Sequence, residues 1–244
     1  MKISVILPTY NESGHIVELI EQMREQLSKL KPRRGYEILV VDDNSPDGTS
    51  ELVKAAFENV DSTRVIQREE RGFATAVLRG LKEATGDILI VMDADFNHNP
   101  RDIPLLVRYL HDFDIVVGSR FVPGGGMESK GRYALTFSLN ALIGMVLGTP
   151  LLDRSSGFFS IKKKNLGRFD FDKIFYGYGD YFLRFLHYAD KMNLRILEIP
   201  TFYPQRASGK SKTQVIPVVG RFLVSMLKLK IEDFSARSGK KIPK

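Results

Sequence analysis

The chain of 244 residues contains no cysteine. Disulfide bonds, zinc–thiolate centres, iron–sulfur clusters and a cysteine nucleophile are therefore excluded. Long apolar runs are also missing. The run Ile3 to Leu7 is too short for a signal peptide, and the stretch Phe137 to Leu152 is short for a membrane span and contains Asn140 and Pro150, which favours a core helix. We therefore expect a cytoplasmic protein.

The common nucleotide-binding loops are absent as well. No Walker-type loop is present, and no Gly-x-Gly-x-x-Gly follows the first apolar run. These absences count against a P-loop NTPase and against a Rossmann dehydrogenase. The run Gly124-Gly125-Gly126 follows no pattern of that kind, so we interpret it as a flexible loop.

Positive charge is concentrated at one end of the chain. The net charge is +7, but residues 203–244 contain ten Lys and Arg against two Asp and Glu, so the rest is close to neutral. A basic segment of this kind favours phosphate or an anionic membrane surface as a partner. We do not expect nucleic acid, because no set of stacking aromatic residues is interleaved with the basic ones.

Apolar strand patterns alternate with amphipathic helix patterns over the first 120 residues. This alternation predicts an α/β fold with a mostly parallel central sheet flanked by helices. After Arg120 the pattern changes, but no repeat or linker divides the chain. We expect one domain over residues 1–231, followed by a flexible basic tail at 232–244. The predicted strands are 3–7, 36–41, 64–67, 87–92, 114–118, 156–161 and 194–203, and the predicted helices are 16–30, 73–84, 101–111, 133–147, 180–192 and 214–230, with a short one from about 50.

Three of the predicted parallel strands end in polar, mostly acidic sequence. These ends are Pro8 to Glu12, Asp42 to Ser45 and Asp93-Ala94-Asp95. Right-handed crossovers place all three at one edge of the sheet, where such folds bind ligands. Concentrated carboxylates repel one another unless cations or hydrogen-bond donors offset their charge. The sequence therefore predicts a cation-dependent site at this edge.

Asp93, Asp95 and Asn97 form the candidate metal site. Their oxygen-only side chains suit Mg2+ or Mn2+ and leave coordination positions open for substrate phosphates. A calcium loop of the EF-hand type is the competing interpretation. It fails because His98 lies where glycine is needed and Pro104 where the bidentate glutamate belongs. The four histidines show no metal spacing, and we assign them no catalytic role.

Several motifs together resemble family 2 of the glycosyltransferases, and within it the polyprenol-phosphate sugar transferases. The motifs keep the family's order and spacing from about residue 2 to about 230. They are Pro8 to Glu12, Val41 to Thr49, Asp93 to Asp95, Gly118 to Phe121 and Arg206 to Lys212. The resemblance implies a GT-A fold with a nucleotide-binding half, 1–120, and an acceptor half, 121–231. It implies an inverting transfer of a hexose from a nucleotide diphosphate, with mannose from GDP-mannose and a polyprenyl phosphate as the expected pair.

The resemblance also assigns roles to individual positions. The nucleotide-binding positions are Pro8, Tyr10, Glu12, Val41 and Asp43. Asp93, Ala94 and Asp95 match the metal and diphosphate positions, with Asn97 where relatives have Gln or Ser. Arg120 matches an arginine that contacts the diphosphate-sugar, and Arg206 and Lys212 match a basic pair near the donor and acceptor phosphates. These cations would stabilise the leaving diphosphate as its charge grows.

One segment departs from the family pattern. Relatives carry Gln and Glu where this chain has Tyr176 to Phe182, and Arg184 lies where they have Glu. Asp180 is a candidate base for a hydroxyl acceptor, although a helix N-cap is an equally good interpretation. A transferase that acts on a hydroxyl acceptor in polysaccharide or glycolipid synthesis is therefore an alternative, and a non-catalytic nucleotide- or sugar-binding module is a more distant one.

The last predicted helix bears on membrane access. A polyprenyl substrate lies in a bilayer, so the enzyme must dock on the cytoplasmic face of the membrane or use a membrane-anchoring subunit. One apolar stripe, flanked by Arg221 and Lys228, is formed by Val215, Val218, Val219, Phe222, Leu223, Met226 and Leu227. This stripe either inserts among lipid headgroups or packs on the body of the enzyme.

Overall fold

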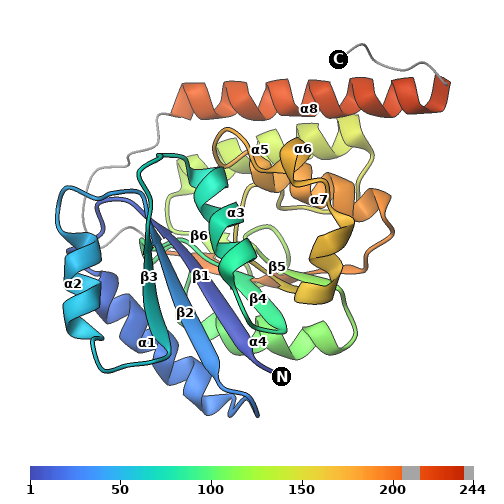
Figure 1. Ribbon diagram of the computed structural model, residues 1–244. Coiled ribbons are helices and arrows are strands. Elements are labelled where there is room, and N and C mark those ends of the chain that lie inside the picture. Colours follow the sequence, from blue (N-terminus) through green and yellow to red (C-terminus); the bar gives the residue numbers. More distant parts are fainter. Residues whose placement is uncertain (205–214, 239–244) are drawn as a thin grey trace.

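The computed structural model describes residues 1–204 and 215–238, arranged around a seven-stranded sheet (Figure 1). The strands are β1 (Ile3–Thr9), β2 (Tyr36–Asp42), β3 (Thr63–Gln67), β4 (Ile88–Val91), β5 (Ile115–Ser119), β6 (Gly126–Met127), β7 (Phe159–Lys162), β8 (Ile196–Pro200) and β9 (Phe202–Tyr203). The α-helices are α1 (Ile16–Lys29), α2 (Thr49–Ala56), α3 (Phe73–Glu83), α4 (Ile103–Arg108), α5 (Lys130–Leu147), α6 (Phe171–Ile174), α7 (Tyr181–Lys191) and α8 (Val215–Ser238). Three 3-10 turns complete the list: η1 (Pro100–Asp102), η2 (Tyr109–His111) and η3 (Lys163–Arg168).

The strand order in the large sheet is β3-β2-β1-β4-β7-β5-β8. Every pairing is parallel except those of β7, which runs antiparallel between β4 and β5. The mostly parallel sheet predicted from the alternating pattern is confirmed. Because β7 is reversed, the loop that precedes it lies at the same edge as the carboxyl ends of β4 and β5.

Both faces of the sheet are covered by helices, because side chains along each strand alternate between the two faces. Ile3, Val5 and Leu7 of β1 pack with α1, α2 and α4, whereas Ile6 packs on the opposite face with α3 and α7. Helix α3 lies so close to β1 that a Cβ on Gly80 would come 2.3 Å from Ile6. All seven residues of β1 are buried, as expected for a central strand.

Helix α8 lies across the top of the molecule in Figure 1, beside α5. A third apolar cluster, separate from the two sheet faces, joins α5, α7 and α8, and it contains Ile143, Leu147, Leu183, Phe222, Met226 and Leu229. Phe222 and Met226 are only 4% and 5% exposed. Of the two interpretations of this stripe, packing on the body of the enzyme is therefore correct for Phe222 and Met226.

The structure differs from the prediction at the end of the last helix and in the last strand. The tail expected from residue 232 onward is still helical as far as Ser238, because Glu232 accepts a hydrogen bond from Tyr188 at 2.6 Å and Asp233 pairs with Lys191 at 3.0 Å. The single strand predicted over 194–203 is divided into β8 and β9 at Thr201. The division follows Pro200, which has no amide proton to continue the ladder.

Within residues 1–204 and 215–238, no helix has both the length and the apolar character needed to cross a bilayer. Helix α5 is the most uniformly apolar of the long helices and ends at Gly148, whose φ of 69° is the left-handed conformation that commonly terminates a helix.

Candidate active site

The carboxyl ends of β1, β2 and β4 meet at one edge of the sheet, as predicted. Pro8 and Val41, two predicted nucleotide-binding residues, are register partners on β1 and β2, and both are buried. Tyr10 follows β1 and is half-buried, with the Arg71 guanidinium 4.5 Å from the centre of its ring. The strands therefore bring together the first two predicted clusters.

Two of the acidic side chains at this edge connect neighbouring loops by hydrogen bonds. Asp42 accepts hydrogen bonds from the Thr9 hydroxyl at 3.2 Å and from the Ser45 hydroxyl and amide at 2.5 and 2.9 Å. Asp47 accepts from the amides of Ser13 and Thr49, each at 3.1 Å. These bonds fix the loop after β1 against the loop after β2, so both carboxylates have a structural role.

Asp43 faces a different loop. Its carboxylate accepts a hydrogen bond from Arg68 at 2.9 Å and another from the amide of Gly72 at 2.8 Å. Burial raises the pKa of Asp43 even though these two donors oppose the shift. The side chain predicted to contact the nucleotide is thus held rigidly in place.

His15 links the loop after β1 to the loop after β4. Its Nε2 atom lies 3.0 Å from the Glu12 carboxylate and 2.9 Å from the carbonyl oxygen of Ala94. Both neighbours are acceptors, so Nε2 carries a proton that it donates to them. Sequence reasoning missed this residue, because nothing in the motif spacing shows that residues 15 and 94 are in contact.

Asp93 and Asp95 follow β4 in a short loop and remain partly exposed. Asn97 donates its side-chain amide to one Asp95 oxygen at 2.7 Å and its backbone amide to the other at 3.2 Å. No group of three or more His, Cys, Asp or Glu side chains with metal-binding geometry occurs in the described parts of the chain. Two partly exposed carboxylates nevertheless fit a divalent ion whose other ligands come from a substrate and water.

Arg120, directly after β5, is fixed by a buried ion pair. Its guanidinium donates two hydrogen bonds to Asp153, at 2.8 and 2.7 Å, and a third to the Ser155 hydroxyl at 2.8 Å. Although burial opposes the charge, the Asp153 carboxylate raises the pKa of Arg120 above its ordinary value. Asp153 lies in the loop before β7, and sequence reasoning missed it because only the reversed direction of β7 brings it to this edge.

Asp180 has a structural partner. Its carboxylate accepts hydrogen bonds from Arg184, which is buried, and from the Ser225 hydroxyl of α8 at 2.7 Å. Asp180 occupies the N-cap position of α7, as one of the two interpretations expected, but its side chain makes no cap hydrogen bond to the helix. Burial alone would raise the pKa of Asp180, but the bonds from Ser225 and Arg184 lower it, which makes the carboxylate a weak base. Arg206 and Lys212, the other two predicted basic residues, lie outside the described residues.

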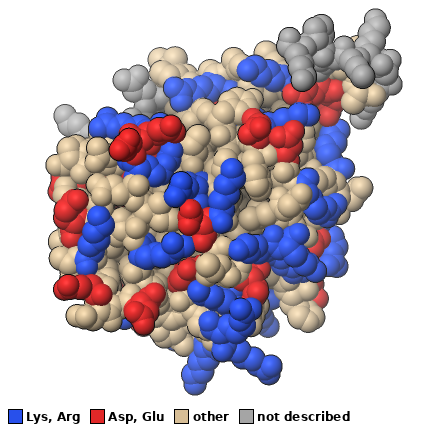
Figure 2. Space-filling view, in the orientation of Figure 1, with Lys and Arg blue, Asp and Glu red and all other residues tan. Residues whose placement is uncertain are grey.

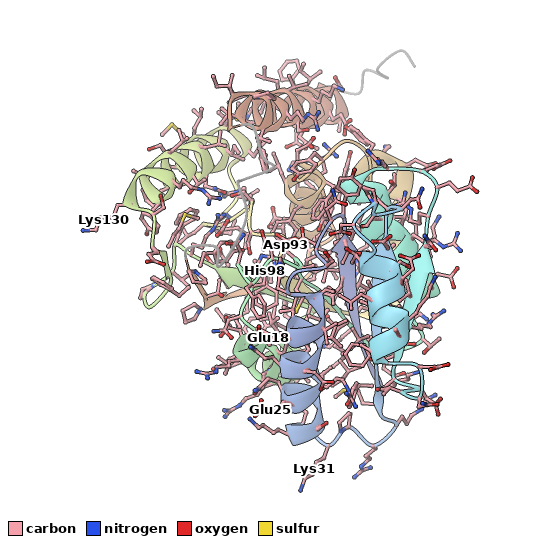
Figure 3. The ribbon with its side chains drawn as sticks, turned by 90° about the vertical axis from the view of Figure 1, so that its left-hand side faces the viewer. Glu18, Glu25, Lys31, Asp93, His98 and Lys130 are labelled. Carbon is pink, nitrogen blue, oxygen red and sulfur yellow. The ribbon has the colours of Figure 1, made fainter. Side chains whose placement is uncertain are left out.

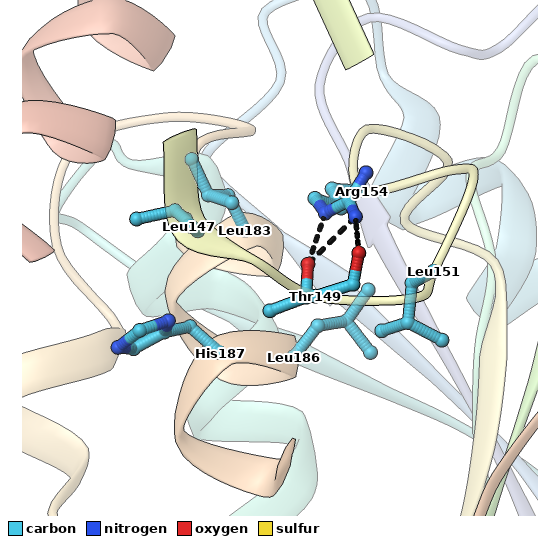
Figure 4. Close-up of a pocket in the computed structure, with 7 residues that line it drawn as sticks. All are labelled: Leu147, Thr149, Leu151, Arg154, Leu183, Leu186 and His187. Carbon is cyan, nitrogen blue, oxygen red and sulfur yellow. Dashed lines mark hydrogen bonds between the residues drawn. The ribbon is translucent and has the colours of Figure 1, made fainter. Parts of the chain in front are cut away.

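Two pockets in the described part of the chain lie away from this edge. The one in Figure 4 lies between the end of α5 and α7, where Arg154 donates to the Thr149 hydroxyl and carbonyl. It has no space for a water molecule. The other, about 870 Å³, is lined by Gly86, Asp87 and Ile88 at the start of β4, and therefore lies at the opposite edge of the sheet. Neither contains a predicted site residue.

The architecture matches that of solved sugar-transferring enzymes. One example is glucosyl-3-phosphoglycerate synthase from Mycobacterium tuberculosis, solved with Mn2+, UDP-glucose and phosphoglyceric acid. The TM-score is 0.70 at 22% sequence identity, and the match covers 94% of this chain and 79% of that one. At this identity the likeness establishes the fold, and the predicted GT-A fold is confirmed.

Sequence comparison identifies the family. The model of glycosyl transferase family 2 matches residues 4–183, and the chain belongs to that family. It is 36% identical over 217 residues to a dolichol-phosphate mannosyltransferase of Pyrococcus furiosus. The aligned region covers 87% of this chain but only 59% of that relative. It is 30% identical to an undecaprenyl-phosphate mannosyltransferase of Micrococcus luteus, over 98% of this chain and 100% of that relative.

Proposed function

We propose that this glycosyltransferase moves a hexose, mannose from GDP-mannose, onto a polyprenyl phosphate with inversion at the sugar. The names of the two mannosyltransferase relatives support the donor sugar and the lipid phosphate. The chain spans 59% of the Pyrococcus relative's length, whereas it spans the whole of the Micrococcus relative. A match over the full length of an undecaprenyl-phosphate mannosyltransferase favours the same reaction here.

The burial and hydrogen bonding of the Asp180 carboxylate are the observation on which our choice of a phosphate acceptor rests. A hydroxyl acceptor needs a general base to remove its proton, whereas a phosphate is already ionised near neutral pH. The carboxylate that sequence offered as a base is buried against Arg184 and has a lowered pKa. A phosphate acceptor, which needs positioning more than deprotonation, fits this arrangement better than the alternative with a hydroxyl acceptor.

Asp93 and Asp95 are the residues that we propose hold a divalent ion, with Asn97 positioning Asp95. Either Mg2+ or Mn2+ satisfies this oxygen donor set, and Mn2+ is present in the structural relative described above. When bound, such an ion supplies positive charge against the diphosphate of the donor. The chain's own contribution is a pair of carboxylates fixed at the carboxyl end of β4.

Arg120 supplies a second, permanent positive charge. Its hydrogen bonds to Asp153 and Ser155 fix the guanidinium, so little reorganisation is needed when negative charge develops on the leaving diphosphate. Arg206 and Lys212 are proposed to act on the donor and acceptor phosphates in the same way. Together these cations distinguish a catalyst from a binding module, which has no need to stabilise a leaving group.

A donor screen tests the proposal. GDP- and UDP-sugars are incubated with Mg2+ or Mn2+ and a polyprenyl phosphate, and lipid-linked sugar is measured. We expect product from GDP-mannose, and we expect Asp95→Asn to reduce turnover at least a hundredfold while the melting temperature changes little. Transfer without any divalent ion, or transfer only to a hydroxyl acceptor, would contradict the proposal. Binding of the donor with no transfer would favour the non-catalytic module.

The acceptor implies contact with a membrane, and the structure offers a surface for it. The exposed face of α8, opposite its packed face, carries Ile216, Val224, Leu227, Ile231 and Phe234, and the adjacent α5 exposes Leu135, Phe137, Leu142 and Met145. We call these nine side chains the α5–α8 apolar face. They make up most of the large exposed hydrophobic residues among the described ones, which is more than scattered surface residues account for.

We propose that the α5–α8 apolar face lies against an anionic bilayer. Lys228 and Lys230 are exposed on α8, and Figure 2 shows uncharged surface interrupted by Lys and Arg along this upper border of the molecule, with Asp or Glu at its right-hand end. Basic residues near anionic headgroups contribute about 1 kcal/mol each to binding. This combination favours a peripheral position on the cytoplasmic face over docking on a membrane-anchoring subunit, and the whole-molecule experiment described in the Discussion separates the two.

A further inference from the structure

The loop that carries the two candidate metal ligands is strained. Phe96, between Asp95 and Asn97, has a φ of 61°, a left-handed conformation that is unfavourable for an aromatic residue. Such a conformation raises the free energy of the loop and persists only when neighbouring contacts hold it. Some group must therefore fix the two ends of the loop.

His98 fixes the loop by a hydrogen bond across it. Its Nδ1 atom accepts the backbone amide hydrogen of Asp93 at 2.7 Å, which closes a loop of six residues. The ring is completely buried and stacks on Phe158, with centroids 4.6 Å apart and planes 10° from parallel. Figure 3 shows Asp93 and His98 next to each other, far from Glu25 in the second half of α1 and from Lys31, which follows that helix.

The opposite nitrogen of the ring is also bound. Because Nδ1 accepts a hydrogen bond, the proton of the neutral ring lies on Nε2. Nε2 is 2.7 Å from the Tyr203 hydroxyl and 3.1 Å from the carbonyl oxygen of Ser156. The Tyr203 hydroxyl in turn donates to the Ser156 carbonyl at 3.1 Å. The orientation of the ring is thus fixed from both sides.

Tyr203 belongs to the same site through a second contact. The Arg120 guanidinium lies over its ring, 4.7 Å from the centroid. Tyr203 is the last residue of β9, which pairs with β6. In the sequence, Arg206 and Lys212 follow it by three and nine residues. One buried hydrogen-bonded chain therefore runs from the main chain of Asp93 to the residue that packs on Arg120.

We infer that His98 is a positioning residue for the divalent ion: its ring holds the main chain of Asp93 in place, and Tyr203 and Ser156 hold the ring. This inference rests on the proposed function, which places the ion on Asp93 and Asp95. Hydrogen bonds of this kind behind a ligand commonly change metal affinity tenfold to a hundredfold. The inference gives a role to a histidine that the sequence motifs left without one.

The test is Mn2+ affinity, measured from the electron paramagnetic resonance signal of the free ion in the presence of saturating GDP. We expect His98→Ala to raise the Kd for Mn2+ at least tenfold. In His98→Asn the side-chain oxygen can still accept the Asp93 amide hydrogen, and we expect it to restore the Kd to within about threefold of the wild-type value. His111→Ala, at an exposed histidine, is the matched control and should leave the Kd unchanged.

A double-mutant comparison tests the second half of the inference. Tyr203→Phe removes only the hydroxyl, and we expect it to raise the Kd for Mn2+ in the wild-type background. It should have no further effect in His98→Ala, because its influence on Asp93 passes through the ring. If His98→Ala does not fold, His98→Asn is compared with His98→Gln, in which the acceptor next to the Asp93 amide is displaced.

The outcomes separate this inference from the proposed function. If Asp95→Asn binds Mn2+ as tightly as the wild type, the metal site itself is misplaced and both ideas fail. If Asp95→Asn loses the ion but a folded His98→Ala keeps the wild-type Kd, only the role of His98 is overturned. Equal Kd values for His98→Asn and His98→Gln would overturn it as well.

Discussion

At the scale of single residues, the acids at the carboxyl edge have different roles that their spacing in the sequence does not reveal. Asp42 accepts a hydrogen bond from Thr9 at the end of β1, Asp47 accepts one from Ser13 in the loop after β1, and Asp43 accepts from Arg68 and Gly72. Each of these carboxylates is occupied by groups that fix the backbone. Asp93 and Asp95 follow β4 and are partly exposed, so both carboxylates are accessible to a cation.

The pair of Arg120 and Asp153 is a strong electrostatic interaction at this edge, because both side chains are buried and the hydrogen bonds are bidentate. We expect Asp153→Asn to lower the free energy of unfolding by about 3 kcal/mol, since it leaves a buried guanidinium without a counter-ion. Turnover should fall as well, because Arg120 loses its fixed position. Urea denaturation and steady-state kinetics measure the two effects.

Asp112 provides the control for this prediction. Its side chain is exposed and pairs with the neighbouring exposed His111, so Asp112→Asn should change the free energy of unfolding by less than about 0.5 kcal/mol. If Asp153→Asn were as stable as this control, the buried pair would not be the anchor of Arg120.

At the scale of elements, α8 has two apolar faces with opposite environments. One face packs on α5 and α7, and the other is exposed to solvent. We expect Phe222→Ala, on the packed face, to lower the free energy of unfolding by about 3 kcal/mol through loss of buried area and a residual cavity. Phe234→Ala, at a position that is 72% exposed, should change it by less than about 0.5 kcal/mol. Equal effects in urea denaturation would mean that α8 does not pack as described.

The contact between α7 and α8 also predicts a dependence of stability on pH. Burial lowers the pKa of His187, while Asp233 of α8 opposes the shift and Lys191 adds to it. The unfolded chain therefore binds a proton more readily than the folded one. The contribution of neutral His187 to the free energy of unfolding is fully present above the ordinary histidine pKa of about 6.5. It decreases as the pH falls below that value, by at most about 1.4 kcal/mol per pH unit.

Comparison of variants isolates this contribution. Burial lowers the pKa of His98 too, to about 4, so the wild type contains two contributions of the same sign. We expect His187→Gln to show a smaller loss of stability than the wild type between pH 7 and pH 5, and His111→Gln to match the wild type. Parallel stability profiles for wild type and His187→Gln would exclude the buried neutral histidine.

At the scale of the whole molecule, we propose that the α5–α8 apolar face gives the enzyme access to a lipid substrate. We expect the protein to co-sediment with anionic vesicles at low salt and to be released at high salt, because the flanking lysines act through screened electrostatics. Phe234→Ser should weaken this binding without loss of the folded state. Phe222→Ser should instead unfold the protein, because that side chain is buried.

Neutral vesicles and a purified sample without lipid complete the experiment. If the protein stays in the supernatant with every lipid composition, membrane access must come from an anchoring subunit. If it self-associates in the absence of lipid and Phe234→Ser makes it monomeric, the face instead joins two copies of the chain.

The sequence by itself determined the layered α/β architecture and the edge at which the site lies. Strands such as β1 and β4 are recognisable because every residue in them is apolar or small enough to be buried between two layers of helices. The positions of Asp93, Asp95 and Arg120 follow from the same pattern, since residues directly after parallel strands must meet at one edge. These are local signals, and each can be observed in a short stretch of the chain.

Only the tertiary structure decided which polar groups are partners. Asp153 reaches Arg120 because β7 runs antiparallel, and Asp180 is bound by Ser225, 45 residues away, because α8 packs across α7. The orientation of α8 was undetermined for the same reason: both of its faces are apolar, and amphipathicity alone cannot select the one that packs. Contacts between distant residues depend on strand direction and helix packing, and periodicity in the sequence contains no information on either.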